Sequence, residues 1–138
     1  MQDKNDQTND QTFQMCTAIV DDEKDLIVVY QKALARKGIP VCFIANDGLE
    51  AVRKFTCCSS KPLVVIMDYR LPIMNGIEAT REMLKLEPET RIIFVSGDIS
   101  AKEDALKAGA FHFLKKPTSI REITSVVTQA MSSDKSIA

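Results

Sequence analysis

The sequence predicts an α/β fold, in which helices cover both faces of an open, doubly wound parallel sheet of five strands. Two observations support this prediction. Short apolar runs alternate with longer amphipathic segments, as they do in consecutive strand–helix units. Five such units occupy about 115 residues, which is too few for a closed eight-stranded barrel. The simplest strand order for the open sheet is 2-1-3-4-5, with five helices.

The expected strands are short, nearly continuous apolar runs, which is the pattern of strands buried on both faces. They lie at residues 16–20, 41–45, 63–67, 91–95 and 110–114. The amphipathic segment that follows each run supplies one of the five helices.

Residues suited to helix caps mark the helix boundaries. Four polar residues stand three positions before a glutamate, which is the spacing of an N-terminal capping box, and they are Asp47, Asn75, Ser100 and Ser119. Gly38 and Gly109 stand where a left-handed residue would end the first and fourth helices. The caps and the apolar period therefore predict helices in the same segments.

One folded domain is expected, because 138 residues, 45% of them apolar, suffice for one core but not for two ordinary domains. Residues 1–14 are rich in Gln, Asn and Asp, so we expect a disordered leader there. The folded domain should span residues 15–131. Residues 132–138 form a tail too short for a DNA-binding or enzymatic output domain, so we expect another protein to provide the output.

Charge, apolar content and cysteine spacing exclude several classes of protein. The net charge of −1, from 18 basic and 19 acidic side chains, provides no electrostatic footprint for nucleic acid or for an anionic membrane. There is no apolar run long enough to span a bilayer and no signal sequence, so we expect a cytoplasmic protein. The four cysteines lack paired spacing, so we interpret them as small buried apolar residues; they are Cys16, Cys42, Cys57 and Cys58.

Polar residues follow four of the expected strands at their carboxyl ends. In open α/β sheets, ligands bind at these ends, near the point where the strand order reverses, here between the first and third strands. We therefore expect the following residues to converge: Asp21, Asp22 and Glu23 after the first strand, Asp68 after the third, Ser96 after the fourth and Lys116 after the fifth.

Carboxylates gathered at this edge would repel one another unless a raised pKa, a cationic side chain or a bound cation relieves them. A set of oxygen ligands favours Mg²⁺ over zinc. Taken singly, Asp21 and Asp22 also suit a helix N-cap, and Lys116 suits an exposed surface. Asp68 has no such simple explanation, because a carboxylate at the end of a buried strand is costly without a charged partner.

The sequence resembles the response regulator receiver family of two-component signalling over nearly all of residues 16–131. The matching motifs are the acidic pair Asp21 and Asp22, the stretch IMDYRLPIMNG from Ile66 to Gly76, the step Ser96-Gly97, and the stretch GAFHFLKKP from Gly109 to Pro117. The resemblance implies a flavodoxin-like sheet. The family shares the strand order 2-1-3-4-5, so that order is not an independent prediction.

The resemblance also implies a metal-dependent phosphoacceptor. Asp68 matches the residue that accepts the phosphoryl group. Asp22 matches a direct Mg²⁺ ligand, and Asp21 matches a residue that acts mainly through a water. The backbone carbonyl of Arg70 would complete the protein ligands.

Further matches imply how the phosphoryl group is held and sensed. Ser96 matches the hydroxyl residue that hydrogen-bonds the phosphoryl group, and Lys116 matches the lysine that pairs with it. Pro117 resembles the family's cis-proline. Phe113 matches the family's switch aromatic, although core packing alone also explains it. The surface expected to change, and to bind a downstream protein, comprises the fourth helix, fifth strand and fifth helix.

The implied phosphodonor is a histidine kinase or a histidine phosphotransfer protein, since the chain has no glycine-rich loop for ATP. Phosphoryl transfer to a carboxylate mainly requires positioning and neutralised charge, which Mg²⁺, Lys116 and Ser96 would supply. The single histidine, His112, falls in the fifth strand and is interpreted as structural. Thr118 and Gly97 depart from the residues usual in the family.

The residues disfavour two other classes of function, a binding module and an enzyme. A phosphate-independent binding module with the same fold is disfavoured by the intact acidic, hydroxyl and lysine positions. A flavodoxin-like electron carrier would need a hydroxyl-rich phosphate loop where Asp21 and Asp22 stand. An aspartate-nucleophile phosphatase typically has a second aspartate where this chain has Arg70.

Overall fold

The computed structural model describes residues 13–132. Most of the expected leader, residues 1–14, and most of the expected tail, residues 132–138, lie outside the described residues. The first strand begins at Phe13, three residues earlier than expected.

The five strands form one parallel sheet in the order β2-β1-β3-β4-β5. This arrangement confirms the predicted α/β, flavodoxin-like fold. Strand positions match the prediction, and their ends differ from it by three residues or fewer. The strands are β1 (Phe13–Val20), β2 (Val41–Ala45), β3 (Lys61–Met67), β4 (Arg91–Ser96) and β5 (His112–Lys115).

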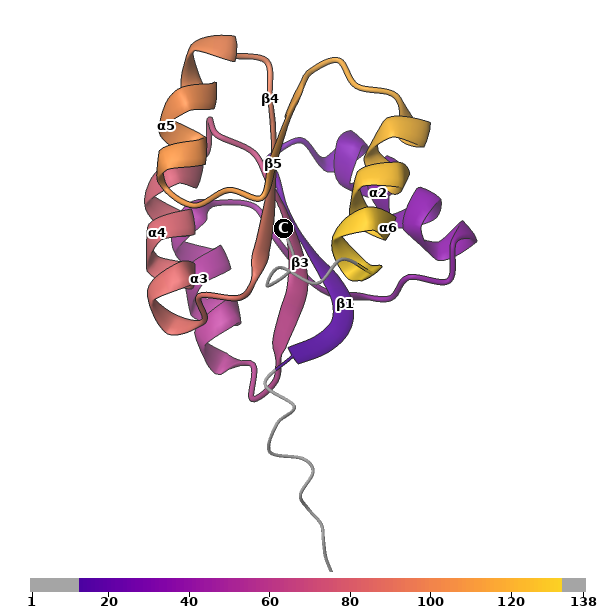
Figure 1. The fold of residues 1–138 in the computed structure, drawn as a ribbon, viewed down its shortest axis with the longest axis horizontal. Helices are drawn as coiled ribbons and strands as arrows, with labels where there is room; N and C mark the ends of the chain where they lie inside the picture. The colour runs from indigo at the N-terminus through magenta and orange to yellow at the C-terminus, as the bar shows by residue number, and fades with distance from the viewer. Residues whose placement is uncertain (1–12, 133–138) are drawn as a thin grey trace, which may run out of the picture.

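Helices cover both faces of this sheet, as Figure 1 shows with labels that begin at α2. Helices α2 and α6 lie on one face, and α3, α4 and α5 lie on the other. Their bounds are α2 (Lys24–Arg36), α3 (Gly48–Cys57), α4 (Gly76–Leu86), α5 (Lys102–Lys107) and α6 (Ile120–Ser132), with a short 3₁₀ helix, η1 (Ile99–Ala101), before α5. Within residues 13–132, no helix is both long enough and apolar enough to cross a membrane.

Strand β3 shows why continuous apolar runs were the correct signal. Val64 and Ile66 pack in the core beneath α2 and α6, whereas Val65 and Met67 pack beneath α3, α4 and α5. All four are at most 1% exposed. Because successive side chains point to opposite faces and both faces are covered, every position must be apolar.

Three of the four predicted N-terminal caps are confirmed. Asp47 accepts a hydrogen bond from the backbone of Glu50 at 2.7 Å, and Ser119 accepts one from the backbone of Glu122 at 3.0 Å. Asn75 forms a reciprocal capping box with Glu78, with distances of 2.9 and 3.2 Å.

The predicted cap at Ser100 is wrong. Asp98 caps the 3₁₀ helix instead, since its carboxylate accepts hydrogen bonds from both the backbone and the hydroxyl of Ser100. Ser100 therefore lies inside that turn, and α5 begins at Lys102 without a side-chain cap. The hydroxyl of Ser100 donates to the Asp98 carboxylate within this turn, so it does not cap the backbone of α5.

Both predicted helix-ending glycines are confirmed, with φ of 71° at Gly38 and 110° at Gly109. At Gly38, backbone hydrogen bonds run from Gly38 to Ala35 and from Ile39 to Leu34, each at 3.0 Å. This pair of bonds defines a Schellman motif, which glycine tolerates best because it has no Cβ.

The cysteine prediction holds only in part. Cys16 is buried in the core, Cys42 and Cys58 are half-buried, and Cys57 is exposed. Cys57 is the last residue of α3, whose buried side near this end is formed by Phe55, so the interpretation of Cys57 as buried is wrong.

Candidate functional site

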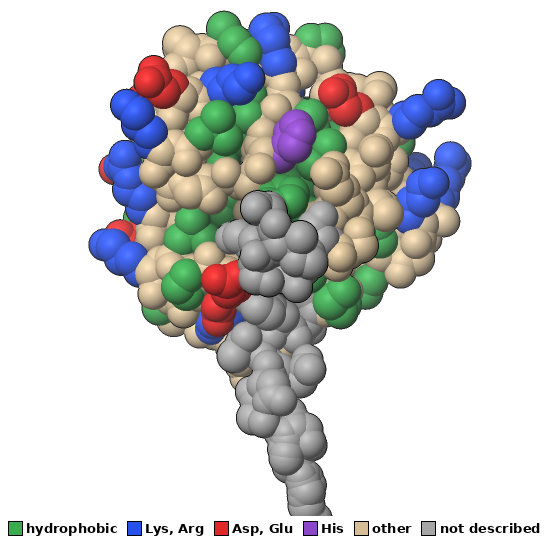
Figure 2. Space-filling view, viewed as in Figure 1, with side chains coloured by type: hydrophobic (Ala, Val, Ile, Leu, Met, Phe, Trp, Pro, Cys, Tyr) green, Lys and Arg blue, Asp and Glu red, His purple; other side chains and the backbone are tan. Residues whose placement is uncertain are grey.

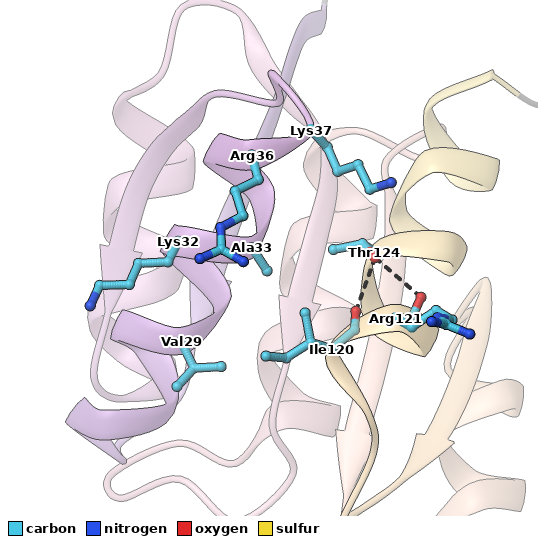
Figure 3. Close-up of a pocket in the computed structure, with 8 residues that line it drawn as sticks. All are labelled: Val29, Lys32, Ala33, Arg36, Lys37, Ile120, Arg121 and Thr124. Carbon is cyan, nitrogen blue, oxygen red and sulfur yellow. Dashed lines mark hydrogen bonds between the residues drawn. The ribbon is translucent and has the colours of Figure 1, made fainter.

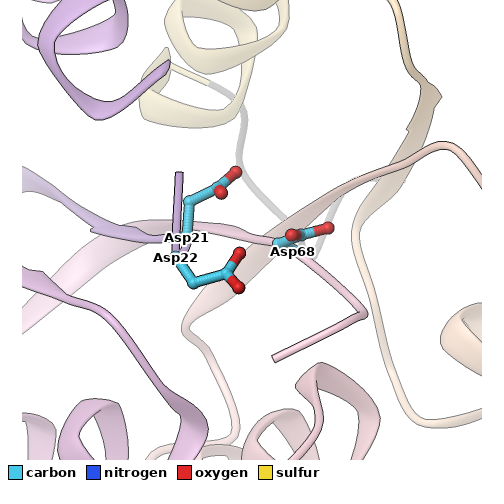
Figure 4. Close-up of side chains that lie close together, drawn as sticks. All are labelled: Asp21, Asp22 and Asp68. Carbon is cyan, nitrogen blue, oxygen red and sulfur yellow. The ribbon is translucent and has the colours of Figure 1, made fainter. Parts of the chain in front are cut away.

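The carboxyl ends of β1 and β3 bring three aspartates together. These strands are neighbours at the centre of the sheet, and the backbone of Asp68 donates to the carbonyl of Val20 at 3.0 Å. Asp21 and Asp22, which follow Val20, therefore leave the sheet beside Asp68, which follows Met67. Their carboxyl groups lie on the same side of the strand ends (Figure 4), with one oxygen of each within 4.8 Å of the others.

Two of the three carboxylates are buried and held by the local backbone. Asp21 is 1% exposed, and its Oδ1 accepts from the backbone of Glu23 at 2.9 Å. Asp68 is 7% exposed, and its Oδ1 accepts from the backbone of Tyr69 at 2.8 Å. Asp22 is exposed and lines the pocket above them.

Lys116 supplies the positive charge nearest to this cluster. Its Nζ lies 3.2 Å from Oδ2 of Asp21, 3.2 Å from Oε1 of Glu23 and 3.5 Å from Oδ2 of Asp68. The backbone of Lys116 donates to the carbonyl of Ser96 at 2.9 Å, which continues the pairing of β5 with β4. The following bond, Lys116-Pro117, is cis, as the family resemblance implied.

Burial and crowding shift the pKa values of these groups. Burial raises the pKa of Asp68 to about 6, and the charge of Asp21 raises it as well, whereas Lys116 opposes both effects. Burial also raises the pKa of Asp21, against the backbone N–H of Glu23 and the charge of Lys116. Burial alone would lower the pKa of Lys116, but attraction to Asp21 and Asp68 outweighs it, so that pKa is raised. One lysine thus compensates the carboxylates only in part.

Ser96 lies where the sequence predicted, at the end of β4. It is 1% exposed, and its Oγ accepts from the backbone of Asp98 at 3.1 Å. Ser96 and Asp68 line one pocket of about 570 Å³, together with Asp22, Glu23, Arg70, Gly97, Asp98 and Lys116. Since the hydroxyl oxygen accepts, its proton is available for a group placed in that pocket.

The side chain of Arg70 pairs with Asp98 rather than with one of the three clustered aspartates. It is 77% exposed, and its guanidinium pairs with Oδ2 of Asp98 at 3.3 Å. The metal role predicted for Arg70 concerned its backbone carbonyl, so this side-chain contact leaves that prediction as it was.

Phe113 is part of the core beneath α5. It is 9% exposed and stacks on Phe94, with ring centroids 6.4 Å apart and planes 14° apart. Phe113 lies three residues before Lys116, and its side chain packs on the face of the sheet that α3, α4 and α5 cover. A switching role for Phe113 remains a prediction.

Two residues of the site were not assigned a role from the sequence. Glu23 is the third acidic partner of Lys116, and Asp98 holds both Ser96 and Arg70. Glu23 was visible as part of an acidic triplet, but its contact with Lys116 joins residues 93 positions apart. No sequence motif at Asp98 predicted that it would contact Ser96 or Arg70.

Gly76 lets α4 begin directly against the backbone of Asp68. An added Cβ there would lie 2.0 Å from the backbone oxygen of Asp68 and 3.1 Å from Cγ of Met67. Any side chain at this position would displace the backbone of Asp68, so the asparagine-glycine step after β3 serves close packing as well as helix capping.

Comparison with known proteins identifies the family. The model of the response regulator receiver domain matches residues 17–128. The chain belongs to the response regulator receiver family. It is therefore a receiver domain of the kind found in two-component signalling, a family whose members interact with histidine kinases and downstream effectors.

Relatives of this receiver include both small and large proteins. Chemotaxis protein CheY of Thermotoga maritima is 38% identical over 101 residues, which cover 72% of this chain and 82% of that protein. Regulatory protein AtoC of Escherichia coli is 34% identical over 115 residues, which cover 82% of this chain but only 24% of AtoC.

Solved structures agree with the fold and with the family. A receiver domain protein from Clostridium thermocellum has a TM-score of 0.81 and 27% identity, and the match covers 91% of this chain and 100% of that one. The receiver domain of sensor histidine kinase PA1611 from Pseudomonas aeruginosa has a TM-score of 0.76 and 27% identity, with 86% and 98% covered. The PA1611 structure is described as having a magnesium ion coordinated in its active site cleft.

Proposed function

We propose that Asp68 accepts a phosphoryl group, in a Mg²⁺-dependent reaction in the cytoplasm, from a partner histidine kinase or histidine phosphotransfer protein. The observation that carries this proposal is the setting of Asp68: it is 7% exposed, crowded by Asp21 and faced by Lys116 at 3.5 Å. A buried carboxylate of this kind is typical of a functional site rather than of a surface.

Asp68 is better placed to accept the group than its two neighbours. Asp21 is 1% exposed and is not among the residues that line the pocket, and its oxygens are held by the backbone of Glu23 and by Nζ of Lys116. Asp22 is exposed, so water would compete at its oxygens. Asp68 has one oxygen fixed by the backbone of Tyr69, while the other faces Lys116 at the floor of the pocket.

The donor set fits a hard divalent cation. All three side chains are carboxylates, with oxygens gathered within 4.8 Å, and oxygen-only sets favour Mg²⁺ over softer metals. Asp22 and Asp68 would hold the ion directly, Asp21 would act mainly through a water, and the carbonyl of Arg70 would complete the protein ligands. When bound, the ion supplies positive charge that offsets the charge of the phosphoryl oxygens.

Transfer itself exchanges one bond to phosphorus for another. A carboxylate oxygen of Asp68 forms the new P–O bond, the P–N bond of the donor's phosphohistidine breaks, and the histidine nitrogen leaves with its electron pair. The product is an acyl phosphate on Asp68. This chain contributes positioning and charge balance, which are the main demands of phosphoryl transfer.

Lys116 and Ser96 would hold the transferred group. Lys116 lies beside the reactive oxygen of Asp68, so its ammonium can pair with a phosphoryl oxygen there. The Ser96 hydroxyl can donate its proton to a second phosphoryl oxygen while its own oxygen accepts from Asp98. A new double negative charge would draw both groups toward it.

The switch would run from Ser96 to the surface made by α5, β5 and α6. Inward movement of Ser96 would open space beneath the turn that leads into α5, and Phe113, stacked on Phe94, lies next to that space. Changed packing of Phe113 would then alter the outer face for a downstream protein.

Intact mass measurement after incubation with acetyl phosphate and Mg²⁺ tests the proposal. We expect one phosphoryl adduct on the wild-type chain and none on Asp68→Asn, because the amide lacks the nucleophilic oxygen but keeps the size of the side chain. Chelation of Mg²⁺ should prevent the adduct on the wild-type chain.

Asp104→Asn is the matched control, since Asp104 is an exposed aspartate on α5. It should form the adduct like the wild type. An adduct of equal amount on Asp68→Asn would place the acceptor elsewhere, and no adduct on any variant would favour a phosphate-independent binding module.

A further inference from the structure

A second hollow lies on the opposite face of the sheet from α4, between α2 and α6. It has a volume of about 390 Å³, which is within the range of small-molecule sites. Eight residues line it, and we call it the α2–α6 groove: Val29, Lys32, Ala33, Arg36, Lys37, Ile120, Arg121 and Thr124.

Small side chains create this hollow where the two helices meet. Ala33 is 6% exposed and Thr124 is 5% exposed, and together they form the floor. The hydroxyl of Thr124 donates to the carbonyls of Ile120 at 2.9 Å and Arg121 at 3.1 Å, as Figure 3 shows. Because its own helix satisfies this hydroxyl, Thr124 presents an apolar floor to the groove.

The walls of the groove are apolar, and its rim is cationic. Val29 and Ile120 face each other across the gap, and Ile120 is 52% exposed. In Figure 3, Lys37 reaches from the end of α2 toward α6, and the guanidinium of Arg36 lies over Ala33. Lys32 and Arg121 extend outward on either side.

No acidic side chain lines the groove, and none of its four cations has an ion pair with any residue from 13 to 132. Figure 2 shows basic side chains projecting together from the edge that α2 and α6 form, whereas acidic and basic side chains are mixed over α4 and α5. The chain as a whole has a net charge of −1, so this excess is local.

We propose that the α2–α6 groove binds a small amphipathic anion, with an apolar chain or ring between Val29 and Ile120 and a carboxylate head against Arg36 and Lys37. Charge complementarity fixes the sign of the head group. The short apolar walls suit one chain or ring. A partner helix would need apolar anchors over two turns, and the cationic rim interrupts such a stripe.

Decanoate is a suitable probe, because it joins a ten-carbon chain to a carboxylate. Titration of the full chain, followed by NMR of the methyl groups of Val29 and Ile120, should give saturable shifts. Decylammonium has the same chain length and the opposite charge, and it should bind at least about tenfold more weakly. Equal affinity for the two probes would overturn the proposal, as would the absence of saturable shifts at these methyl groups.

Removal of two rim charges tests the head-group contact. The double variant Arg36→Gln/Lys37→Gln should weaken decanoate binding by about fivefold or more. The double variant Arg53→Gln/Lys102→Gln is the matched control, because it removes one arginine and one lysine, both exposed and without an ion pair in the described part of the chain. An equal loss in the two variants would mean that overall charge, rather than the groove, attracts decanoate.

Filling the floor tests the apolar part of the site. Ala33→Leu should abolish the shifts at Ile120 while the circular dichroism spectrum stays that of a folded chain; unchanged decanoate binding would contradict the proposal. If Ala33→Leu does not fold, the two rim variants decide the outcome. Asp68→Asn should bind decanoate like the wild type, since this inference does not depend on phosphorylation.

Discussion

The acidic site at the strand ends and the α2–α6 groove both carry an excess of one sign of charge, but they tolerate it differently. In the acidic site, Asp21 and Asp68 are buried, and Lys116 lies within 3.5 Å of both. In the groove, the four cations are exposed and surrounded by water. Buried like charges must be compensated by the protein or by a bound ion, whereas exposed ones are screened by solvent.

This difference predicts how sensitive each region is to change. A substitution in the acidic site alters pKa values, stability and chemistry together, because the groups share one buried space. A substitution on the groove rim alters little except the affinity for a charged ligand.

The largest expected effect comes from the packing that keeps Asp68 buried. Gly76→Ala should destabilise the fold by about 2–4 kcal/mol, because the new Cβ would lie 2.0 Å from the backbone oxygen of Asp68. It should also slow phosphorylation. Urea unfolding and the rate of adduct formation measure both effects.

Gly97→Ala is the control for Gly76→Ala. An added Cβ at Gly97 meets nothing nearer than Cβ of Lys116 at 4.0 Å, so stability should change by less than about 0.5 kcal/mol. Similar losses in the two alanine variants would show that the close approach at Gly76 is not what positions Asp68.

The buried charge of Asp68 should make stability depend on pH. Its pKa is about 6 in the folded state and 3.8 when unperturbed, so the folded chain binds more protons between these values. The free energy of unfolding should therefore fall as the pH rises from 4 through 6, by up to about 3 kcal/mol from this group. Asp21, whose pKa is also raised, contributes in the same direction.

Asp68→Asn should remove most of that slope and stabilise the chain at pH 7 without Mg²⁺. Urea unfolding at pH 4, 5, 6 and 7, in chelator, compares the two proteins. A wild-type slope of opposite sign, or one that Asp68→Asn leaves unchanged, would refute the assignment of this pH dependence to Asp68.

Removal of the compensating lysine should have a smaller effect. Lys116→Met should destabilise the chain by about 1–3 kcal/mol at pH 8 and by less at pH 5, where the carboxyl groups can take up protons. It should also raise the pKa of Asp68 further, as measured by NMR titration of the carboxyl carbon.

Lys115→Met provides the comparison, because Lys115 is exposed and its Nζ contacts only the carbonyl of Lys116, at 3.3 Å, among the described residues. It should leave both stability and the pKa of Asp68 unchanged. If Lys115→Met and Lys116→Met behave alike, Lys116 is not the group that balances the acidic site.

The smallest effect is expected at the exposed ion pair of the site. Arg70→Ala should lower the free energy of unfolding by less than about 0.5 kcal/mol, because the Arg70 side chain is 77% exposed and solvent screens its ion pair with Asp98. Adduct formation should persist, since the predicted metal contact uses the backbone carbonyl. Loss of the adduct in Arg70→Ala would instead assign the side chain a direct role.

The fold was predictable because its signals are local. Apolar runs, three of the four caps, and Gly38 and Gly109 each depend on a few neighbouring residues. Ser100 failed as a cap because the chain forms a 3₁₀ helix at Ile99–Ala101 that Asp98 caps, and the path of the chain out of β4 is not set by the local pattern. Cys57 failed because its exposure depends on which side of α3 meets the core.

The site was predictable as far as strand ends define it. Asp21, Asp68, Ser96 and Lys116 converge because parallel strands bring their carboxyl ends to one edge. The contact of Glu23 with Lys116 and the pairing of Arg70 with Asp98 depend on side-chain conformations. The groove depends on Ala33 meeting Thr124, which only the crossing of α2 and α6 determines.

Chemical trapping of the phosphorylated chain tests the central claim most directly. Borohydride reduces an acyl phosphate on aspartate to homoserine, and peptide mass spectrometry then locates the changed residue. After incubation with acetyl phosphate and Mg²⁺, we predict homoserine at position 68 alone. Homoserine at position 21 or 22, or a stable phosphoryl group on His112, would contradict the account.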